Sequence, residues 1–130
     1  MKKDEQNKKL EPTKAELEIL QVLWEKGPST VRAVNDELLK EKEVIYTTTL
    51  KLMQIMTEKG ILQRDERQMK HIYSVTEKEQ DTKAHLLKKF VDSIYKGSAS
   101  KLVLQLLGNN KTSQEELDAI REILKKIEKD

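Results

Sequence analysis

Residues 46–60 read Tyr-Thr-Thr-Thr-Leu-Lys-Leu-Met-Gln-Ile-Met-Thr-Glu-Lys-Gly, and their spacing is that of a helix with two different faces. Side chains that recur at helical offsets predict a buried stripe made of Thr49, Leu52, Met53 and Met56. The opposite face carries Thr47, Lys51, Gln54 and Glu58. Gly60 can adopt the left-handed conformation that ends a helix, so we expect this helix to stop there.

The polar face of this helix has the chemistry of a surface that reads DNA. Threonine is unfavourable inside a helix, but at a helix start its hydroxyl can cap backbone donors or hold phosphates. Lysine can hold the DNA backbone and glutamine can read adenine edges, which separates positioning from base readout. An ordinary amphipathic helix with a polar outer face is the alternative, and it is the commoner kind.

Composition limits the classes of protein to which the chain can belong. Its 130 residues suit one domain, or one small domain with an appended helical piece. The 25 basic and 23 acidic residues nearly cancel, so any nucleic-acid binding must use a local patch. There is no Cys, and no apolar run follows the charged N-terminus, so we expect a soluble cytoplasmic protein that does not insert into a membrane. Residues 1–11 are almost wholly polar, and we expect them to form a mobile tail.

Two helices are predicted before residue 46. Pro12 and the capping box Thr13-Lys-Ala-Glu16 open the first, which ends at Gly27. Its apolar stripe consists of Leu17, Leu20, Leu23 and Trp24. Ser29 or Thr30 caps the second. The apolar positions of that second helix are Val31, Val34 and Leu38.

After Gly60 the apolar period changes to that of strands. Residues 61–65 and 71–75 are predicted strands, and the polar residues 66–70 between them predict the turn of a hairpin. Three helices followed by a two-stranded hairpin is the element order of a winged helix-turn-helix, in which the third helix enters the major groove. The hairpin gathers three cations, Arg64, Arg67 and Lys70. These cations can neutralise phosphates or enter a narrow minor groove, although solvated cations on a hairpin are equally ordinary.

Three further helices are predicted in the C-terminal part. Capping boxes at residues 76–79 and 113–116 open two of them, one reaching Tyr95 and the other running toward the C-terminus, and residues 98–107 form a short apolar helix between them. The last helix has apolar residues in the alternating spacing of a pairing seam. This apolar surface exceeds what a winged domain needs, so we expect a two-fold dimer, the alternative being that the helices fold back on the first domain. The expected dimerisation residues are Leu87, Phe90, Ile94, Leu102, Leu106, Leu117, Ile120, Leu124 and Ile127.

The predicted fold class is therefore mainly α (α+β), a winged helix-turn-helix with a C-terminal three-helix dimerisation region. We expect a tail over residues 1–11, a winged-helix DNA-binding domain over 12–76 and a helical dimerisation region over 77–130.

The sequence resembles the BlaI/MecI/CopY, or penicillinase repressor, family of bacterial transcriptional repressors over nearly its whole length. The resemblance rests on the residues of the first helix up to Lys26-Gly27-Pro28, on Tyr46-Thr47-Thr48, on Glu58-Lys59-Gly60, on the hairpin ending at Tyr73 and on the helix over residues 102–106. It implies a homodimer that binds a palindromic double-stranded DNA operator and reads it with the third helix. Together with the hairpin cations, the expected DNA-binding residues are Thr47, Thr48, Lys51, Gln54, Arg64, Arg67 and Lys70.

Three departures from the family pattern bear on function. Gln54-Ile55 stands where many members have Asn-Arg, so the operator preference need not carry over. The copper-responsive branch is disfavoured because Cu(I) needs thiolate ligands and this chain has no Cys. In the antibiotic-responsive branch a membrane sensor-protease triggers cleavage at an Asn-Phe bond. The matching position here is Gln105-Leu106, which makes cleavage at this bond a hypothesis.

No catalytic motif is present, so we expect a protein that is not an enzyme and needs no cofactor or metal. The chain has two histidines, His71 and His85, and we expect His71 to be a packing or surface residue. A different class of function is the alternative: a helical adaptor that binds a partner protein through the C-terminal helices. An adaptor has no reason to place Thr47, Thr48 and Lys51 on one exposed side beside Arg67.

Overall fold

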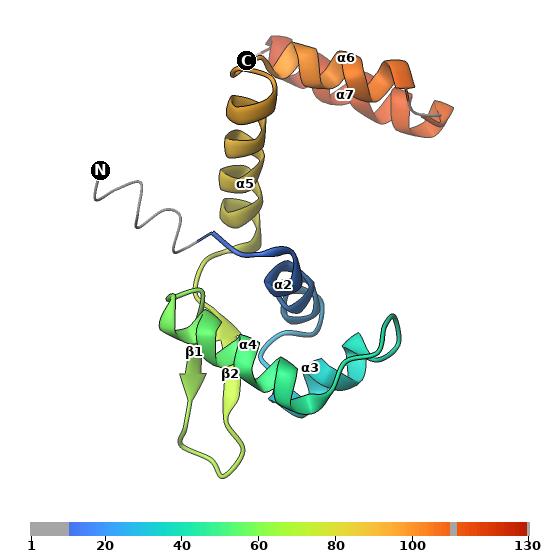
Figure 1. Ribbon diagram of the computed structural model, residues 1–130. Coiled ribbons are helices and arrows are strands. Elements are labelled where there is room, and N and C mark those ends of the chain that lie inside the picture. Colours follow the sequence, from blue (N-terminus) through green and yellow to red (C-terminus); the bar gives the residue numbers. More distant parts are fainter. Residues whose placement is uncertain (1–10, 110–111, 130) are drawn as a thin grey trace, which may run out of the picture. The chain divides into compact units, whose positions relative to one another are not determined.

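The computed structural model describes residues 11–109 and 112–129 of the chain (Figure 1). The chain divides into two compact units, one through Leu86 and one from Leu87 onward. Each unit is described by itself. The predicted tail lies outside the described residues apart from Glu11, and the predicted domain boundary after residue 76 stays a proposal.

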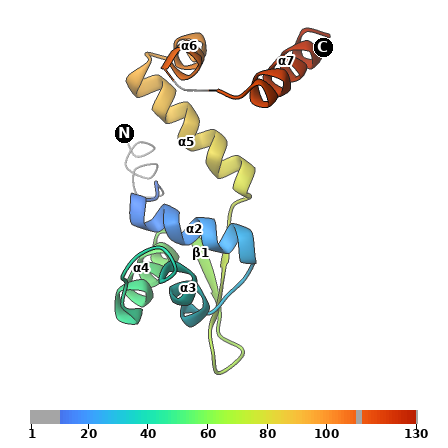
Figure 2. The same ribbon diagram turned by 90° about the vertical axis from the view of Figure 1, so that its right-hand side faces the viewer.

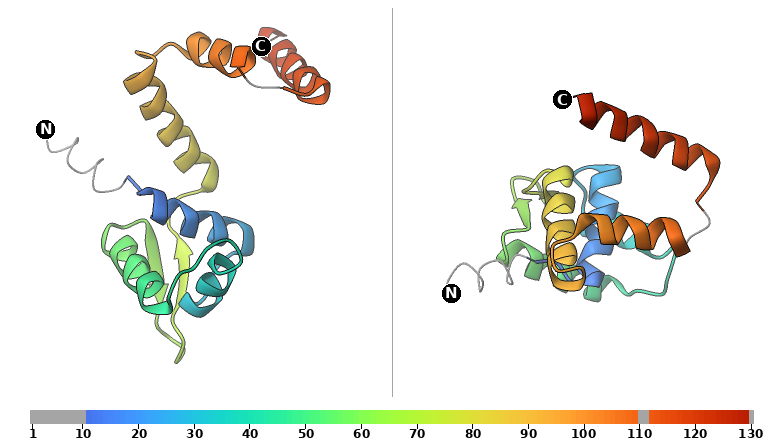
Figure 3. Two further views of the ribbon diagram at one scale, coloured as in Figure 1. Left: turned by 45° about the vertical axis from the view of Figure 1, so that its right-hand side comes forward. Right: turned by 90° about the horizontal axis from the view of Figure 1, so that it is seen from above.

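The first unit holds three helices and a hairpin. Helices α2 (Lys14–Lys26), α3 (Val31–Leu38) and α4 (Tyr46–Glu58) precede strands β1 (Leu62–Asp65) and β2 (Ile72–Val75). The strands pair antiparallel, with Leu62 opposite Val75 and Asp65 opposite Ile72. Helices α3 and α4 pack on each other, and the hairpin turn extends beyond both of them (Figure 2, Figure 3). This is the predicted mainly α winged helix-turn-helix.

Local chemistry explains where these helices begin and end. At α2 the predicted capping box is confirmed: the Thr13 hydroxyl accepts from the Glu16 amide at 3.2 Å, and the Glu16 carboxylate accepts from the Thr13 amide at 2.8 Å. Thr30, not Ser29, caps α3 by accepting from the Ala33 amide. Gly60 has a φ of 84°, the left-handed conformation predicted for the end of the third helix.

A short backbone pairing that the sequence did not predict joins the start of α3 to the hairpin. The Ser29 amide donates to the Tyr73 carbonyl at 3.0 Å, and the Tyr73 amide donates to the Ser29 carbonyl at 2.8 Å. Tyr73 itself is buried in the core. The hairpin is therefore tied to the helix-turn-helix by backbone bonds as well as by side-chain packing.

One apolar core holds the first unit together, and every element contributes to it. The core consists of Ile19, Leu20, Leu23, Val31, Val34, Leu38, Met53, Met56, Ile61, Leu62 and Tyr73. Leu17, Trp24 and Leu52, which the apolar pattern also placed inside, are partly buried against it. The buried stripes predicted for the three helices are thus confirmed.

Three helices follow the hairpin: α5 (Glu79–Ile94), α6 (Ala99–Asn109) and α7 (Gln114–Lys129). The capping box predicted at residues 76–79 is wrong. Helix α5 begins at Glu79, so Thr76 lies too far before it to be its cap. The Thr76 hydroxyl instead donates to the carbonyls of Gly60 at 2.6 Å and Ile61 at 3.0 Å. At α7, Ser113 does act as a cap and accepts from the Glu116 amide.

Much of the apolar surface of the later helices is exposed within the chain. Large side chains at least one-third exposed are Leu87, Phe90, Ile94, Val103, Leu104, Leu106, Leu107, Ile123, Leu124 and Ile127. Among the described helices, none combines the length and apolar character needed to cross a bilayer.

Candidate nucleic-acid interface

The outer face of α4 is polar and exposed. Thr47, Thr48, Lys51 and Gln54 are all exposed, as is Glu58 at the end of the helix. The N-cap residue of the helix is Ile45, and no side chain makes a capping hydrogen bond there. Capping, one of the two roles considered for the threonines, is therefore not the role of the exposed ones. Their hydroxyls are left facing solvent, where they can meet a ligand.

The third threonine of this triplet has a different role. Thr49 is fully buried, and its hydroxyl donates to Oδ1 of Asn35 at 2.6 Å. Asn35 is also buried and belongs to α3. A satisfied polar pair inside an apolar core fixes the rotation of one helix against the other, because slipping the pair apart would leave two unpaired polar groups. It therefore sets which face of α4 points outward.

The far end of α4 is held by an ion pair. Nζ of Lys59 lies 2.7 Å from Oε1 of Glu16, whose side chain is buried in the first turn of α2. Burial raises the pKa of the Glu16 carboxyl, but hydrogen bonds from Lys59 and from Thr13 outweigh that effect and hold the pKa below its ordinary value. Glu16 is thus a carboxylate at neutral pH, and α4 is anchored near both ends.

Two of the three hairpin cations are paired with acidic neighbours. The Arg67 guanidinium makes a two-pronged contact with Asp65, with nitrogen-to-oxygen distances of 2.8 and 3.0 Å. This contact lowers the pKa of Asp65 to about 2. Arg64 forms an ion pair with Glu66 through a single guanidinium nitrogen. The arginines are exposed and gathered at the hairpin as predicted, but much of their charge is neutralised locally.

Lys70 differs from these arginines. It is exposed, and in the described ranges it forms no ion pair with an acidic side chain. Next to it Met69 is fully exposed at the tip of the hairpin.

A groove of about 430 Å³ lies between α3, α4 and the hairpin. Its lining consists of Thr30, Val31, Arg32, Tyr46, Leu50, Met69, Lys70, His71 and Tyr73. The guanidinium carbon of Arg32 stands 4.6 Å from the centre of the Tyr46 ring, a cation–π contact between α3 and α4.

Sequence reasoning missed Arg32, Tyr46 and His71 as candidates for the interface. One signal was present for Arg32. A cation in the first turn of a helix interacts unfavourably with the helix dipole, which suggests that Arg32 has a role other than stabilising α3. No local signal joined Arg32 to Tyr46, which lies fourteen positions later.

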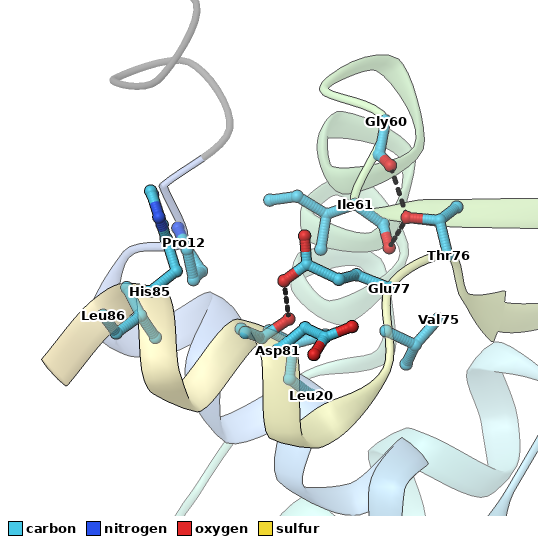
Figure 4. Close-up of a pocket in the computed structure, with 11 residues that line it drawn as sticks. Pro12, Leu20, Gly60, Ile61, Val75, Thr76, Glu77, Asp81, His85 and Leu86 are labelled. Atoms are coloured by element: carbon cyan, nitrogen blue, oxygen red, sulfur yellow. Dashed lines mark hydrogen bonds between the residues drawn. The ribbon is translucent and has the colours of Figure 1, made fainter. Parts of the chain in front are cut away.

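A second cavity of the first unit, also about 430 Å³, has a different character (Figure 4). Leu20, Ile61 and Val75 provide apolar walls, while Glu77 and Asp81 bring carboxylates. The Glu77 carboxylate is occupied by a hydrogen bond from the Thr82 hydroxyl at 2.7 Å. In the part of the chain that the structure describes, no cluster of three His, Asp or Glu side chains is arranged to hold a metal ion.

The residues predicted for dimerisation lie on three helices. Leu87, Phe90 and Ile94 are exposed on α5, Leu106 on α6, and Leu124 and Ile127 on α7. Leu102, Leu117 and Ile120 are half-buried. The Gln105-Leu106 bond lies inside α6, so a protease needs that helix to unwind before it can cleave there.

The fold and the exposed face of α4 define the class as a winged helix-turn-helix protein. Residues 12–126 match the penicillinase repressor family, and the chain belongs to that family. It is 30% identical over 123 residues to the penicillinase repressor of Staphylococcus aureus, covering 95% of this chain and 98% of that protein. The methicillin resistance regulatory protein MecI of Staphylococcus aureus (strain N315) is 30% identical over 92% of this chain and 98% of its own length. The penicillinase repressor of Bacillus licheniformis is 27% identical, with 85% of this chain and 86% of that protein covered. The family predicted from the sequence is confirmed.

Proposed function

We propose that this protein is a homodimeric, sequence-specific DNA-binding repressor that occludes a palindromic operator. The observation that carries the proposal is the exposure of Thr47, Lys51 and Gln54 on a helix that is anchored near both ends. A helix that reads bases must enter the groove with a fixed rotation, and the Asn35–Thr49 and Glu16–Lys59 contacts provide it. The relatives named as penicillinase repressors support the same function.

Each candidate residue has a role that follows from its chemistry. Thr47, Thr48 and Lys51 hold phosphates or base edges at the start of α4, and Gln54 reads bases one turn later. The hairpin cations contact the flanking backbone. Arg64 and Arg67 reach phosphates only by exchanging their acidic partners, whereas Lys70 is free of such a partner within residues 11–109 and 112–129.

Dimerisation provides the control of occupancy. Exposed apolar side chains on α5, α6 and α7 would be buried against a second copy. Two reading helices would then meet major-groove faces about 34 Å apart, or a multiple of this distance, and exclude polymerase. Since the second half-site binds as part of the same complex, any event that weakens the dimer lowers occupancy without touching either reading helix.

Proteolysis at Gln105-Leu106 is a hypothesis for such an event, with a membrane sensor-protease as the partner that triggers it. Cleavage would divide α6 and separate the apolar residues before the bond from those after it. The test is incubation of the purified protein with the cognate sensor-protease, followed by mass spectrometry. A chain that stays intact contradicts the hypothesis and leaves DNA binding untouched.

A mobility-shift titration tests the central proposal. The probe is duplex DNA from the region upstream of the protein's own gene, and the proteins are wild type, Lys51→Glu and the matched charge reversal Lys14→Glu on α2. We expect Lys51→Glu to weaken binding by about tenfold or more, because a phosphate or base contact becomes a repulsion, while Lys14→Glu binds as wild type does. Equal binding by all three proteins would contradict the role of α4.

The helical adaptor is the second candidate, favoured by the exposed leucines and isoleucines of α6 and α7. It predicts that the purified chain stays monomeric and ignores duplex DNA even in dilute buffer. Sedimentation analysis and the same titration therefore separate the two functions.

A further inference from the structure

The groove between α3, α4 and the hairpin adjoins the face of α4 that we propose reads DNA. Tyr46 and Leu50 of α4 line the groove, and Thr47 and Lys51 are the next residue after each of them. Successive helical residues are separated by about a quarter turn, so the two pairs form neighbouring stripes on one helix. A duplex whose major groove receives Thr47 and Lys51 therefore brings one strand of its backbone to this groove.

The groove has the charge of an anion site. Its lining includes Arg32, Lys70 and His71 and contains no acidic side chain. In the portion of the chain that the structure describes, neither Arg32 nor Lys70 forms an ion pair. The arginines on the outer side of the hairpin, by contrast, are paired with Asp65 and Glu66.

Arg32 is also held in place. Its guanidinium lies over the Tyr46 ring at 4.6 Å, which limits the rotamers that the long side chain explores. A guanidinium that is already oriented loses less conformational entropy when it binds a phosphate with two parallel hydrogen bonds. The Tyr46–Arg32 contact thus prepares the groove for an anion of this geometry.

His71 adds a charge that depends on pH. We propose that Arg32, Lys70 and His71 together hold a backbone phosphate of duplex DNA, and that His71 takes up a proton when the DNA binds. A phosphodiester attracts an imidazolium but gains little from a neutral imidazole, so the complex favours the protonated ring. The other charged or titratable residues that line the groove with His71 are Arg32 from α3, Tyr46 from α4, and Lys70 and Tyr73 from the hairpin.

The direction of the effect follows from this linkage. Because the bound state holds more protons than the free state, affinity for DNA increases as pH falls and decreases as pH rises. The inference rests on the proposed DNA binding. In addition, the occupancy of DNA responds to pH through His71, whose contact with a backbone phosphate does not depend on the base sequence.

The test uses fluorescence anisotropy with a random-sequence duplex in low-salt buffer, because a phosphate contact needs no operator. For the full-length protein we expect Kd to fall by about threefold to tenfold per bound protomer between about pH 8 and pH 6. His71→Gln should show a much smaller dependence on pH. His85→Gln, which alters the other histidine in a different cavity of the same unit, should keep the wild-type dependence.

His71→Lys supplies a fixed positive charge and gives an independent measurement. We expect it to bind at about pH 8 as tightly as wild type binds at about pH 6. Calorimetry in two buffers of different ionisation enthalpy should show proton uptake on binding for wild type and almost none for His71→Gln.

The outcomes separate this inference from the function on which it rests. If His71→Gln binds DNA with the full wild-type dependence on pH, the inference is overturned and DNA binding stands. If wild type binds no duplex in any buffer, both fail. A third outcome is that inorganic phosphate binds saturably, that this binding depends on His71, and that the affinity for DNA does not. The groove would then be a site for a free anion, and the inference is again overturned.

Discussion

Nζ of Lys59 lies 2.7 Å from Oε1 of Glu16, and this contact joins the end of α4 to the first turn of α2. The same carboxylate oxygen accepts a hydrogen bond from the Thr13 amide, at 2.8 Å. One buried carboxylate therefore caps α2 and also orients the helix that carries the candidate DNA contacts.

Glu16→Gln should destabilise the fold. The amide can still accept from Thr13 but no longer balances the charge of Lys59, so we expect the free energy of unfolding to fall by about 1–3 kcal/mol. Urea denaturation followed by circular dichroism measures the change. Glu18→Gln is the matched control, since Glu18 pairs with Lys42 at the surface, and its effect should stay within about 0.5 kcal/mol. Equal effects of the two substitutions would show that burial of Glu16 does not matter.

The same residue predicts a loss of stability in acid. The pKa of Glu16 is lowered in the folded protein from an ordinary value of 4.5, so its contribution is fully present above that value. The contribution is lost as pH falls through the lower folded value. Thermal melts between about pH 7 and pH 3 should therefore show a steeper loss for wild type than for Glu16→Gln. Parallel curves would contradict the assignment of the charged state to Glu16.

Asp65→Asn should strengthen binding to DNA. The substitution releases Arg67 from its two-pronged contact and removes a negative charge from the hairpin. We expect affinity for duplex DNA at low salt to rise by about threefold to tenfold, and the slope of log K against log salt to steepen by about one per protomer. Asp118→Asn on α7 removes the same charge from the second unit and serves as the control. An unchanged slope would mean that Arg67 does not reach a phosphate.

Periodicity predicted the helices because each stripe repeats within the element that it describes. Thr49, Met53 and Met56 are buried as the helical spacing required, and Thr13 caps α2 as its motif required. Gly60, just after α4, adopts the left-handed conformation because glycine does so without a steric penalty.

Contacts between distant residues were beyond the reach of this reasoning. The motif at Thr76 failed because both the amide and the hydroxyl of this residue donate to backbone carbonyls fifteen or sixteen residues earlier, and α5 begins only at Glu79. Arg32 and Tyr46 meet only after α3 and α4 have packed. The pairing of Arg67 with Asp65 is local, but it depends on the backbone of the turn, which composition alone does not determine.

The neighbouring threonines Thr48 and Thr49 should separate stability from binding. Thr49→Val removes the hydroxyl that donates to buried Asn35, and we expect it to destabilise the fold by about 1–3 kcal/mol. Thr48 is exposed, so Thr48→Val should change the free energy of unfolding by no more than about 0.5 kcal/mol. It should weaken DNA binding by about threefold to tenfold. Both variants are measured by denaturation and by anisotropy: Thr49→Val should lose stability, and Thr48→Val should lose affinity for DNA. If Thr48→Val binds DNA as wild type does, the exposed hydroxyl is not a contact.

Leu124→Asp should convert the protein to a monomer and weaken its hold on a two-site operator. Leu124 is 52% exposed on α7, so a charge there is tolerated within the chain and is harmful only if a second copy covers it. Sedimentation should show the monomer, and the loss of bivalent binding should lower operator affinity by about a hundredfold or more. Lys126→Gln changes the charge on the same helix by the same amount and should remain dimeric. A Leu124→Asp variant that stays dimeric and binds normally would place the interface elsewhere, while weak binding of a single half-site by the monomer would show that the winged unit itself is intact.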